Sequence, residues 1–195
     1  QNNKNHRRNF GIQNLTFMLI AGYAIGYILQ LVDSNQLVDS SLLGYLTLDP
    51  YQILQGQVWR LVTWLMVPPR SFDIFTLLML YFYYRIGTLL ENIWGTAKYT
   101  RYILGGIILT VAAAFLMLGY MKIFMGMDEL SLAYYCANGS RAFSTYYINF
   151  AIFMGYAATF PDMMVLFFFV IPLKIKVLGI IELLALVYMF FKCSF

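Results

Sequence analysis

Long apolar runs, separated by charged or turn-forming residues, constrain this chain more than any other feature. A bilayer core is about 30 Å thick, so a membrane helix needs about 20 consecutive apolar residues. Runs of this kind occupy residues 14–32, 72–90, 102–120, 143–160 and 175–191. The sequence therefore predicts an all-α integral membrane protein, a helical bundle with five visible spans. A sixth span is left open.

Composition excludes the main soluble alternatives. The chain is 61% hydrophobic and 11% charged, whereas soluble domains are about 45–50% apolar and about 25% charged. A water-soluble enzyme and a disordered chain are both ruled out. The net charge of +4 comes from scattered basic residues, which indicates orientation in a bilayer rather than nucleic-acid binding. No cofactor or metal is expected, because Cys136 and Cys193 form no metal-binding motif and their pairing in a disulfide stays open.

Two segments between the runs need separate interpretation. Residues 33–71 are too many for a plain connector and carry Trp59 and Trp64, so we expect an outer loop folded on the membrane surface with its tryptophans at the headgroups. Within it, Asp49-Pro50 marks a turn or a helix start. Residues 163–171 are too few to span as a helix, so they predict an interfacial or buried segment.

Basic residues fix the predicted orientation. They concentrate in the tail 1–13 and in the connectors after the second and fourth spans, at Lys4, Arg7, Arg8, Lys98, Arg101, Lys174 and Lys176. The positive-inside rule then places the N-terminus in the cytoplasm and residues 33–71 outside. We expect a multi-pass protein of a bacterial plasma membrane, or of the endoplasmic reticulum membrane in a eukaryote. Asn138-Gly139-Ser140 would lie outside, as a glycosylation sequon or a turn.

Several motifs occur in a recognisable order. Trp59-Arg60 lies in the outer loop, Gly87 and Glu91 form a GxxxE motif at the end of the second run, and Trp94-Gly95 follows. The fourth run carries two further matches, Ala151-Ile152-Phe153 and Thr159-Phe160-Pro161. Over residues 47–180 this pattern resembles the rhomboid superfamily. The resemblance implies a rhomboid-like transmembrane domain over residues 14–195, with structural roles for Trp59, Arg60, Gly87, Glu91 and Gly95.

The same resemblance implies that the protease chemistry is missing. It places Asn149 at the position of the serine nucleophile, with Phe75 and Met79 at the positions that serve the oxyanion. An amide is not an alkoxide nucleophile, and neither Phe75 nor Met79 donates a hydrogen bond. The one histidine, His6, lies in the tail. The pattern is similar to rhomboid pseudoproteases, namely the inactive rhomboids and derlins.

Polar residues inside the spans have several readings. Glu182 lies within the fifth run, where a carboxylate is costly; helix packing or a protonated, hydrogen-bonded state is favoured over a proton or ion relay. Asn149 needs hydrogen-bond partners when buried, and Tyr146 or Tyr147 is the expected one. Glu91 is expected to bind neighbouring backbone or an arginine such as Arg85.

The resemblance implies a function in binding transmembrane segments of client or partner proteins, in quality control, trafficking or complex assembly. Two alternatives stay open. One is an active intramembrane serine protease, with Ser144 as a candidate hydroxyl. The other is a channel or transporter subunit that uses Glu182. The expected partners are the lipid bilayer and the helices of other membrane proteins, and oligomerisation stays open.

Overall fold

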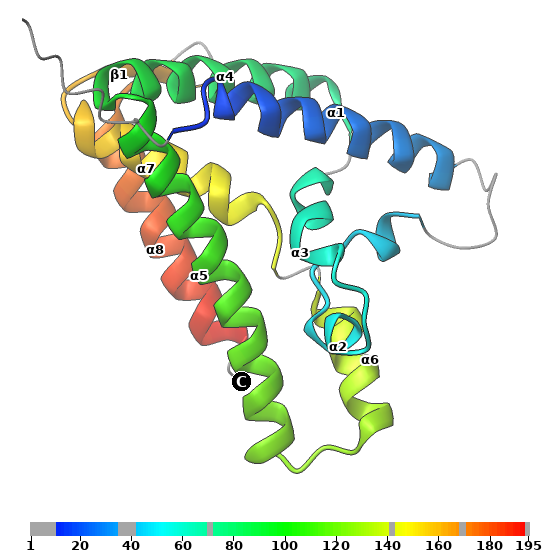
Figure 1. Ribbon diagram of the computed structural model, residues 1–195. Coiled ribbons are helices and arrows are strands. Elements are labelled where there is room, and N and C mark those ends of the chain that lie inside the picture. Colours follow the sequence, from blue (N-terminus) through cyan, green and yellow to red (C-terminus); the bar gives the residue numbers. More distant parts are fainter. Residues whose placement is uncertain (1–10, 35–41, 70–71, 141–142, 168–170, 194–195) are drawn as a thin grey trace, which may run out of the picture.

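The computed structural model describes residues 11–34, 42–69, 72–140, 143–167 and 171–193 (Figure 1). Side chains at 34, 165–167, 171–173, 182, 186–187 and 189–193 lie outside this description. The long helices are α1 (Leu15–Ser34), α4 (Ile74–Trp94), α5 (Thr96–Ile123), α7 (Tyr146–Thr159) and α8 (Ile175–Cys193). The shorter elements are η1 (Leu43–Tyr45), α2 (Pro50–Leu54), α3 (Arg60–Thr63), η2 (Trp64–Met66), α6 (Glu129–Gly139), β1 (Met164–Phe167) and β2 (Ile171–Lys174).

The prediction of a helical membrane protein is confirmed at the level of its helices. Among the described residues, α1, α4 and α5 are long and apolar enough to cross a membrane. The fourth run forms α7, which has 14 residues and is about 21 Å long, shorter than a bilayer core of about 30 Å. The fifth run forms α8, with 19 residues. Five spans therefore stay a prediction, of which three have the required length and composition.

Helix α7 lies at the centre of the bundle. It packs against α4, α5 and α8, while α1 packs against α4 and η2. Figure 1 shows α1 and α4 side by side across the top, with α5 and α8 running down and away from them. The main core joins apolar side chains of α1, α4, α5 and α7, among them Leu90, Tyr99, Ile103, Ile148 and Ile152.

The turn between α4 and α5 differs from the prediction. Helix α4 begins at a capping box, in which the Asp73 carboxylate accepts from the Thr76 backbone N–H at 2.7 Å, and it continues past Glu91 to Trp94. Gly95 has φ +78°, a conformation that favours glycine, and α5 starts at the next residue. Lys98 and Arg101, predicted in a connector, therefore lie in the first turns of α5. Hydropathy located the apolar part of that helix and missed its charged beginning.

The outer segment folds into short helices. Asp49 caps α2, with Pro50 at the first helical position, so the helix start predicted there is confirmed. Trp59 is half exposed, but Trp64 is only 1% exposed and donates its indole N–H to the Leu61 carbonyl at 3.2 Å. The expectation that Trp64 lies among lipid headgroups is therefore wrong: its ring is large enough to fill the space under α1, where the protein core covers it.

Two described elements, β1 and β2, are strands. Part of the 163–171 run forms β1, which pairs antiparallel with β2 so that Val165 faces Leu173 and Leu166 faces Pro172. The two strands form a two-stranded sheet, so Pro172 lies on an edge strand, where a missing N–H is tolerated. The prediction that this segment does not span as a helix agrees with the hairpin.

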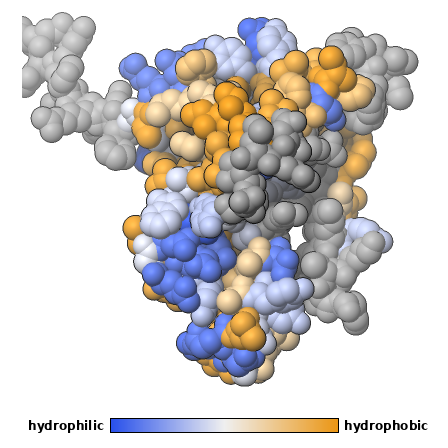
Figure 2. Space-filling model, turned by 90° about the vertical axis from the view of Figure 1, so that its right-hand side faces the viewer, coloured by the Kyte–Doolittle hydropathy of each residue, from blue (hydrophilic) through white to orange (hydrophobic). Residues whose placement is uncertain are grey.

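Segments distant in the sequence gather at two ends of the molecule. At one end the Ile12 N–H donates to Thr100 Oγ1 at 3.0 Å, and the Trp94 indole donates to Thr159 Oγ1 at 3.1 Å. At the other end α2 packs against α6. Figure 2 shows a hydrophobic patch in the upper part, with hydrophilic residues along its top edge, and mainly hydrophilic residues in the lower part, at the height of α2 and α6 in Figure 1. Which end faces the cytoplasm stays a prediction.

Candidate functional site

Asn149, at the position that the resemblance assigns to a nucleophile, lies on α7 in the core. Its side chain is 4% exposed, and Oδ1 accepts a hydrogen bond from the Tyr23 hydroxyl of α1 at 3.2 Å. The expected partner, Tyr146 or Tyr147, is therefore corrected to Tyr23. Tyr147 is 41% exposed, so its side chain points away from the core. The amide connects two helices and satisfies a buried polar group.

The beginning of α7 is held by backbone contacts. Thr145 is fully buried, and its hydroxyl donates to the Val67 carbonyl at 2.8 Å. The Ser144 hydroxyl accepts from the Tyr146 N–H at 3.4 Å. In the part of the chain that the structure describes there is no histidine, so neither hydroxyl has an imidazole base beside it. His6 lies outside the described residues.

Phe75 and Met79, the positions matched to the oxyanion site, lie on the first half of α4. Their side chains are 58% and 40% exposed, whereas Asn149 is buried. The three residues therefore do not line one enclosed site. An oxyanion site needs donors aimed at one point in a water-excluded space, and these three positions do not supply it.

The GxxxE motif holds α4 against the start of α1. A Cβ added at Gly87 would lie 2.5 Å from Thr16 Oγ1 and 2.6 Å from Thr16 Cγ2, so the two helices pack closely only because this residue is glycine. Glu91 is 8% exposed, and its Oε1 accepts from the Asn14 N–H at 2.9 Å. Its alternative partner, Arg85, is exposed and forms no ion pair with Glu91 among the described residues.

The Trp59-Arg60 motif organises the outer segment. Arg60 is 5% exposed, and its Nη1 donates to the Gly44 and Thr47 carbonyls at 2.7 and 3.1 Å. Its Nε donates to Gln57 Oε1 at 2.8 Å. Burial lowers the pKa of Arg60, while the nearby Asp49 raises it. Arg60 therefore binds backbone carbonyls, the contact that suits a planar guanidinium.

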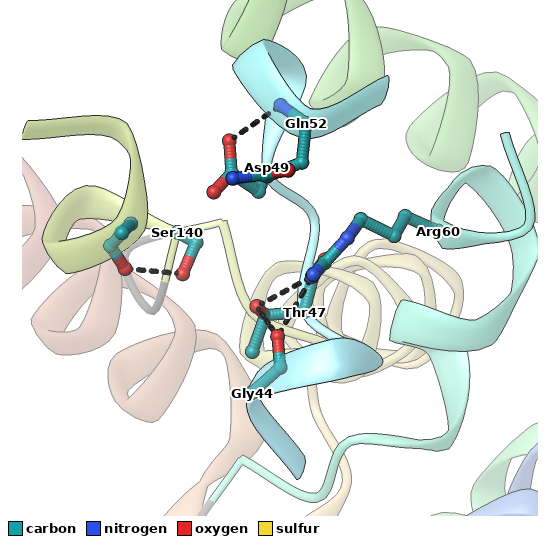
Figure 3. A pocket seen from close by; sticks show the side chains of 7 residues that line it. Gly44, Thr47, Asp49, Gln52, Arg60 and Ser140 are labelled. Carbon is teal, nitrogen blue, oxygen red and sulfur yellow. Dashed lines mark hydrogen bonds between the residues drawn. The ribbon is translucent and has the colours of Figure 1, made fainter. Parts of the chain in front are cut away.

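A cavity of about 230 Å³ lies beside Arg60, between the outer segment and α6 (Figure 3). It is lined by Gly44, Thr47, Asp49, Gln52, Arg60, Ala137 and Ser140. Sequence reasoning placed Arg60 in a motif and Asp49 at a helix start, but it did not bring them to one cavity. Sequence reasoning did not predict α6, and the end of this helix forms the opposite wall of the cavity.

Contacts at this end of the molecule include an exposed polar link between α2 and α6. The Tyr51 hydroxyl donates to Glu129 Oε2 at 2.9 Å, and Lys122 Nζ lies 3.3 Å from Glu129 Oε1. The hydrogen bond from Tyr51 lowers the pKa of Glu129, and Lys122 lowers it further. The same hydrogen bond raises the pKa of Tyr51.

The remaining candidates fall partly outside the structure. Glu182 belongs to α8, but its side chain, like that of Cys193, lies outside the described residues. Cys136 is buried and forms no disulfide with a described residue; its pairing with Cys193 stays untested because the Cys193 side chain is not described. Among the described residues no group of three or more acidic, histidine or cysteine side chains is arranged to hold a metal ion.

These features define a helical integral membrane protein, with a bundle centred on α7 and a folded segment between α1 and α4. Residues 14–194 match the family described as eukaryotic integral membrane protein (DUF1751), and the chain belongs to that family. The bacterial plasma membrane is therefore replaced by the eukaryotic alternative, in which the endoplasmic reticulum stays a prediction. Neither a comparison with curated proteins nor one with solved structures gave a match.

Proposed function

We propose that this protein is a rhomboid-like membrane protein without proteolytic activity that binds transmembrane helices of client or partner proteins, in quality control, trafficking or complex assembly. The observation that carries the proposal is an exposed arginine midway along α4, on the same side of the helix as several exposed apolar residues. The position of Asn149 and the shortness of α7 support it further.

The exposed face of α4 combines apolar side chains with one charge. Ile74, Leu77, Leu78 and Tyr81 are 77%, 54%, 43% and 62% exposed, and their spacing puts them with Arg85 on one side of the helix. Arg85 is the twelfth of the 21 residues of α4, about 16 Å from its beginning. A charged side chain at such a depth costs about 2.5–3.5 kcal/mol and usually has a partner. A client helix with a carboxylate would neutralise it.

The length of α7 favours binding beside the bundle. A helix of 14 residues is shorter than the bilayer core, and a short hydrophobic element is accommodated by local thinning of the bilayer. Helix α4 packs against α7, so polar groups of a client helix bound to α4 would lie closer to water than elsewhere in the membrane. A client with an imperfectly apolar span would gain most from that environment.

The absence of catalysis is supported by Asn149 and its partner. Its amide is buried and bonded to Tyr23, so it neither attacks a carbonyl nor lies open to a substrate. The test is labelling of the purified chain with a fluorophosphonate probe. We expect no labelling above that of a Ser144→Ala variant; labelling that this substitution abolishes would overturn the proposal.

Client binding is tested with synthetic transmembrane helices in nanodiscs that contain the full chain. Three helices differ at one central residue, which is Asp, Asn or Leu, and association is measured by fluorescence energy transfer. We expect the Asp helix to associate at least about tenfold more tightly than the Leu helix, and Arg85→Gln to remove that preference. Arg101→Gln, at an exposed arginine near the end of the bundle, is the control. Equal association of the three helices would refute the proposal.

A further inference from the structure

The cavity between the outer segment and α6 contains two opposite charges that do not pair with each other. Asp49 and Arg60 are 4% and 5% exposed, and both line the cavity. Among the described residues the ion pairs are Lys122–Glu129 and Lys174–Asp162, so the Asp49 carboxylate and the Arg60 guanidinium lie beyond ion-pair distance. Figure 3 shows their side chains on different walls of the cavity.

Each of the two groups keeps hydrogen-bonding capacity for a ligand. Asp49 Oδ1 accepts from the N–H groups of Tyr51 and Gln52 at 3.0 and 3.2 Å, while Oδ2 has no hydrogen bond to a described residue. The guanidinium of Arg60 uses Nε and Nη1 for Gln57, Gly44 and Thr47, and the two protons on Nη2 have no acceptor among the described residues. A carboxylate oxygen and a two-proton donor therefore remain within one cavity.

The charges restrict what such a ligand can be. A simple anion at Arg60 would be repelled by Asp49, and a simple cation at Asp49 would be repelled by Arg60. Buried charges are stable when they are both paired and hydrogen-bonded. A ligand with an ammonium group and an anionic group satisfies both at once and leaves no net charge in the cavity.

The volume restricts its size. Drug-sized ligands occupy pockets of about 300–1,000 Å³, and this cavity has about 230 Å³. At about 30 Å³ for each water-sized volume, it accepts a group of about eight non-hydrogen atoms. Phosphoethanolamine chemistry fits this size and has a phosphate for the fork of Arg60 and three N–H donors for Asp49.

We propose that this cavity binds a phosphoethanolamine group, with the phosphate on Arg60 and the ammonium on Asp49. The group has two sources, the headgroup of a bilayer lipid and a free water-soluble phosphodiester. Choline in its place is disfavoured because a quaternary ammonium has no N–H donor. A serine headgroup is disfavoured because its carboxylate would face Asp49.

The experiment uses the full chain purified in detergent and measures bound lipid by native mass spectrometry. The probes are phosphatidylethanolamine, phosphatidylcholine and phosphatidylserine of identical acyl chains, and water-soluble glycerophosphoethanolamine. We expect the ethanolamine lipid to bind at least about tenfold more tightly than the choline lipid. If glycerophosphoethanolamine binds as tightly as the ethanolamine lipid, the ligand is the free water-soluble phosphodiester. If it fails to compete with the lipid, the ligand is the lipid headgroup.

Asp49→Asn is the decisive variant. Asparagine caps helices as well as aspartate does, so α2 is kept while the charge is lost, and ethanolamine binding should fall at least about tenfold. Asp73→Asn makes the same change at the N-cap of α4, outside the cavity, and should leave binding unchanged. Ala137→Leu fills the cavity without removing a hydrogen bond and should also abolish binding. Equal binding of ethanolamine and choline lipids, no binding of any probe, or full binding by Asp49→Asn and Ala137→Leu would each overturn the proposal.

Discussion

Replacing Gly87 with alanine tests the closest helix contact in the bundle. The added Cβ would lie 2.5–3.0 Å from three atoms of Thr16, where ordinary contacts are 3.4–4 Å, so α1 and α4 must move apart. Overpacking of this kind costs about 1–3 kcal/mol. Movement of Thr16 also breaks its 2.6 Å hydrogen bond to the Tyr99 hydroxyl, which contributes about 0.5–1.5 kcal/mol. The higher helix propensity of alanine returns about 1 kcal/mol.

The expected net loss in the free energy of unfolding is therefore about 0.5–3.5 kcal/mol. The assay is equilibrium unfolding in mixed micelles with increasing dodecyl sulfate, followed by tryptophan fluorescence. Gly105→Ala and Gly106→Ala, on α5, are matched controls because no atom lies within 4 Å of an added Cβ there. They should be neutral or stabilising by up to about 1 kcal/mol. Thr16→Ala should partly rescue Gly87→Ala, and a Gly87→Ala variant as stable as the controls would refute the packing argument.

Three further predictions follow from the polar end of the molecule. The hydrogen bond from Tyr51 lowers the pKa of Glu129. The stability that this bond gives the fold is therefore present above the unfolded pKa of the carboxylate and is lost as the pH falls through the folded pKa. Tyr51→Phe should lower the melting temperature at neutral pH and should leave it unchanged in acid. Burial raises the pKa of Cys136, so in a Cys193→Ser background the thiol should resist maleimide at neutral pH until the protein unfolds; rapid labelling of the folded chain would contradict this. Asn138 is exposed, so translation into microsomes should give a glycosylated product that Asn138→Gln abolishes, and an unmodified wild type would count against the predicted orientation.

Local sequence features predicted much of the architecture. Apolar runs located the long helices because lipid imposes one length and one polarity on every span. Asp49-Pro50 located the start of α2 because capping depends on adjacent residues. The resemblance implied a structural role for Arg60, and the structure shows its guanidinium bound to backbone carbonyls.

Contacts between distant residues were not predictable in this way. Asn149 was matched to tyrosines beside it in the sequence, but its partner is Tyr23, 126 positions away. Helix α6 has 11 residues, too few for a span, and is stabilised by Leu132 and Cys136 packing against Leu118 of α5, a contact that only the folded chain creates. The 163–171 run is short and apolar, a pattern that does not distinguish a strand from a helix.

The hydrogen bonds of α7 explain why the proposed client site is on α4 rather than on α7. Helix α7 is tied at its start through Thr145 to the outer segment, in its first turns through Asn149 to α1, and at its end through Thr159 to Trp94. Its core face is buried, so a substrate would have to break these contacts to reach it. The first half of α4 has exposed apolar side chains over most of its circumference, and a second helix covers them without displacing any described contact. The proposed binding of a client helix therefore needs only a stable flank of the bundle, and the exposed side of α4 is the flank that the proposal uses.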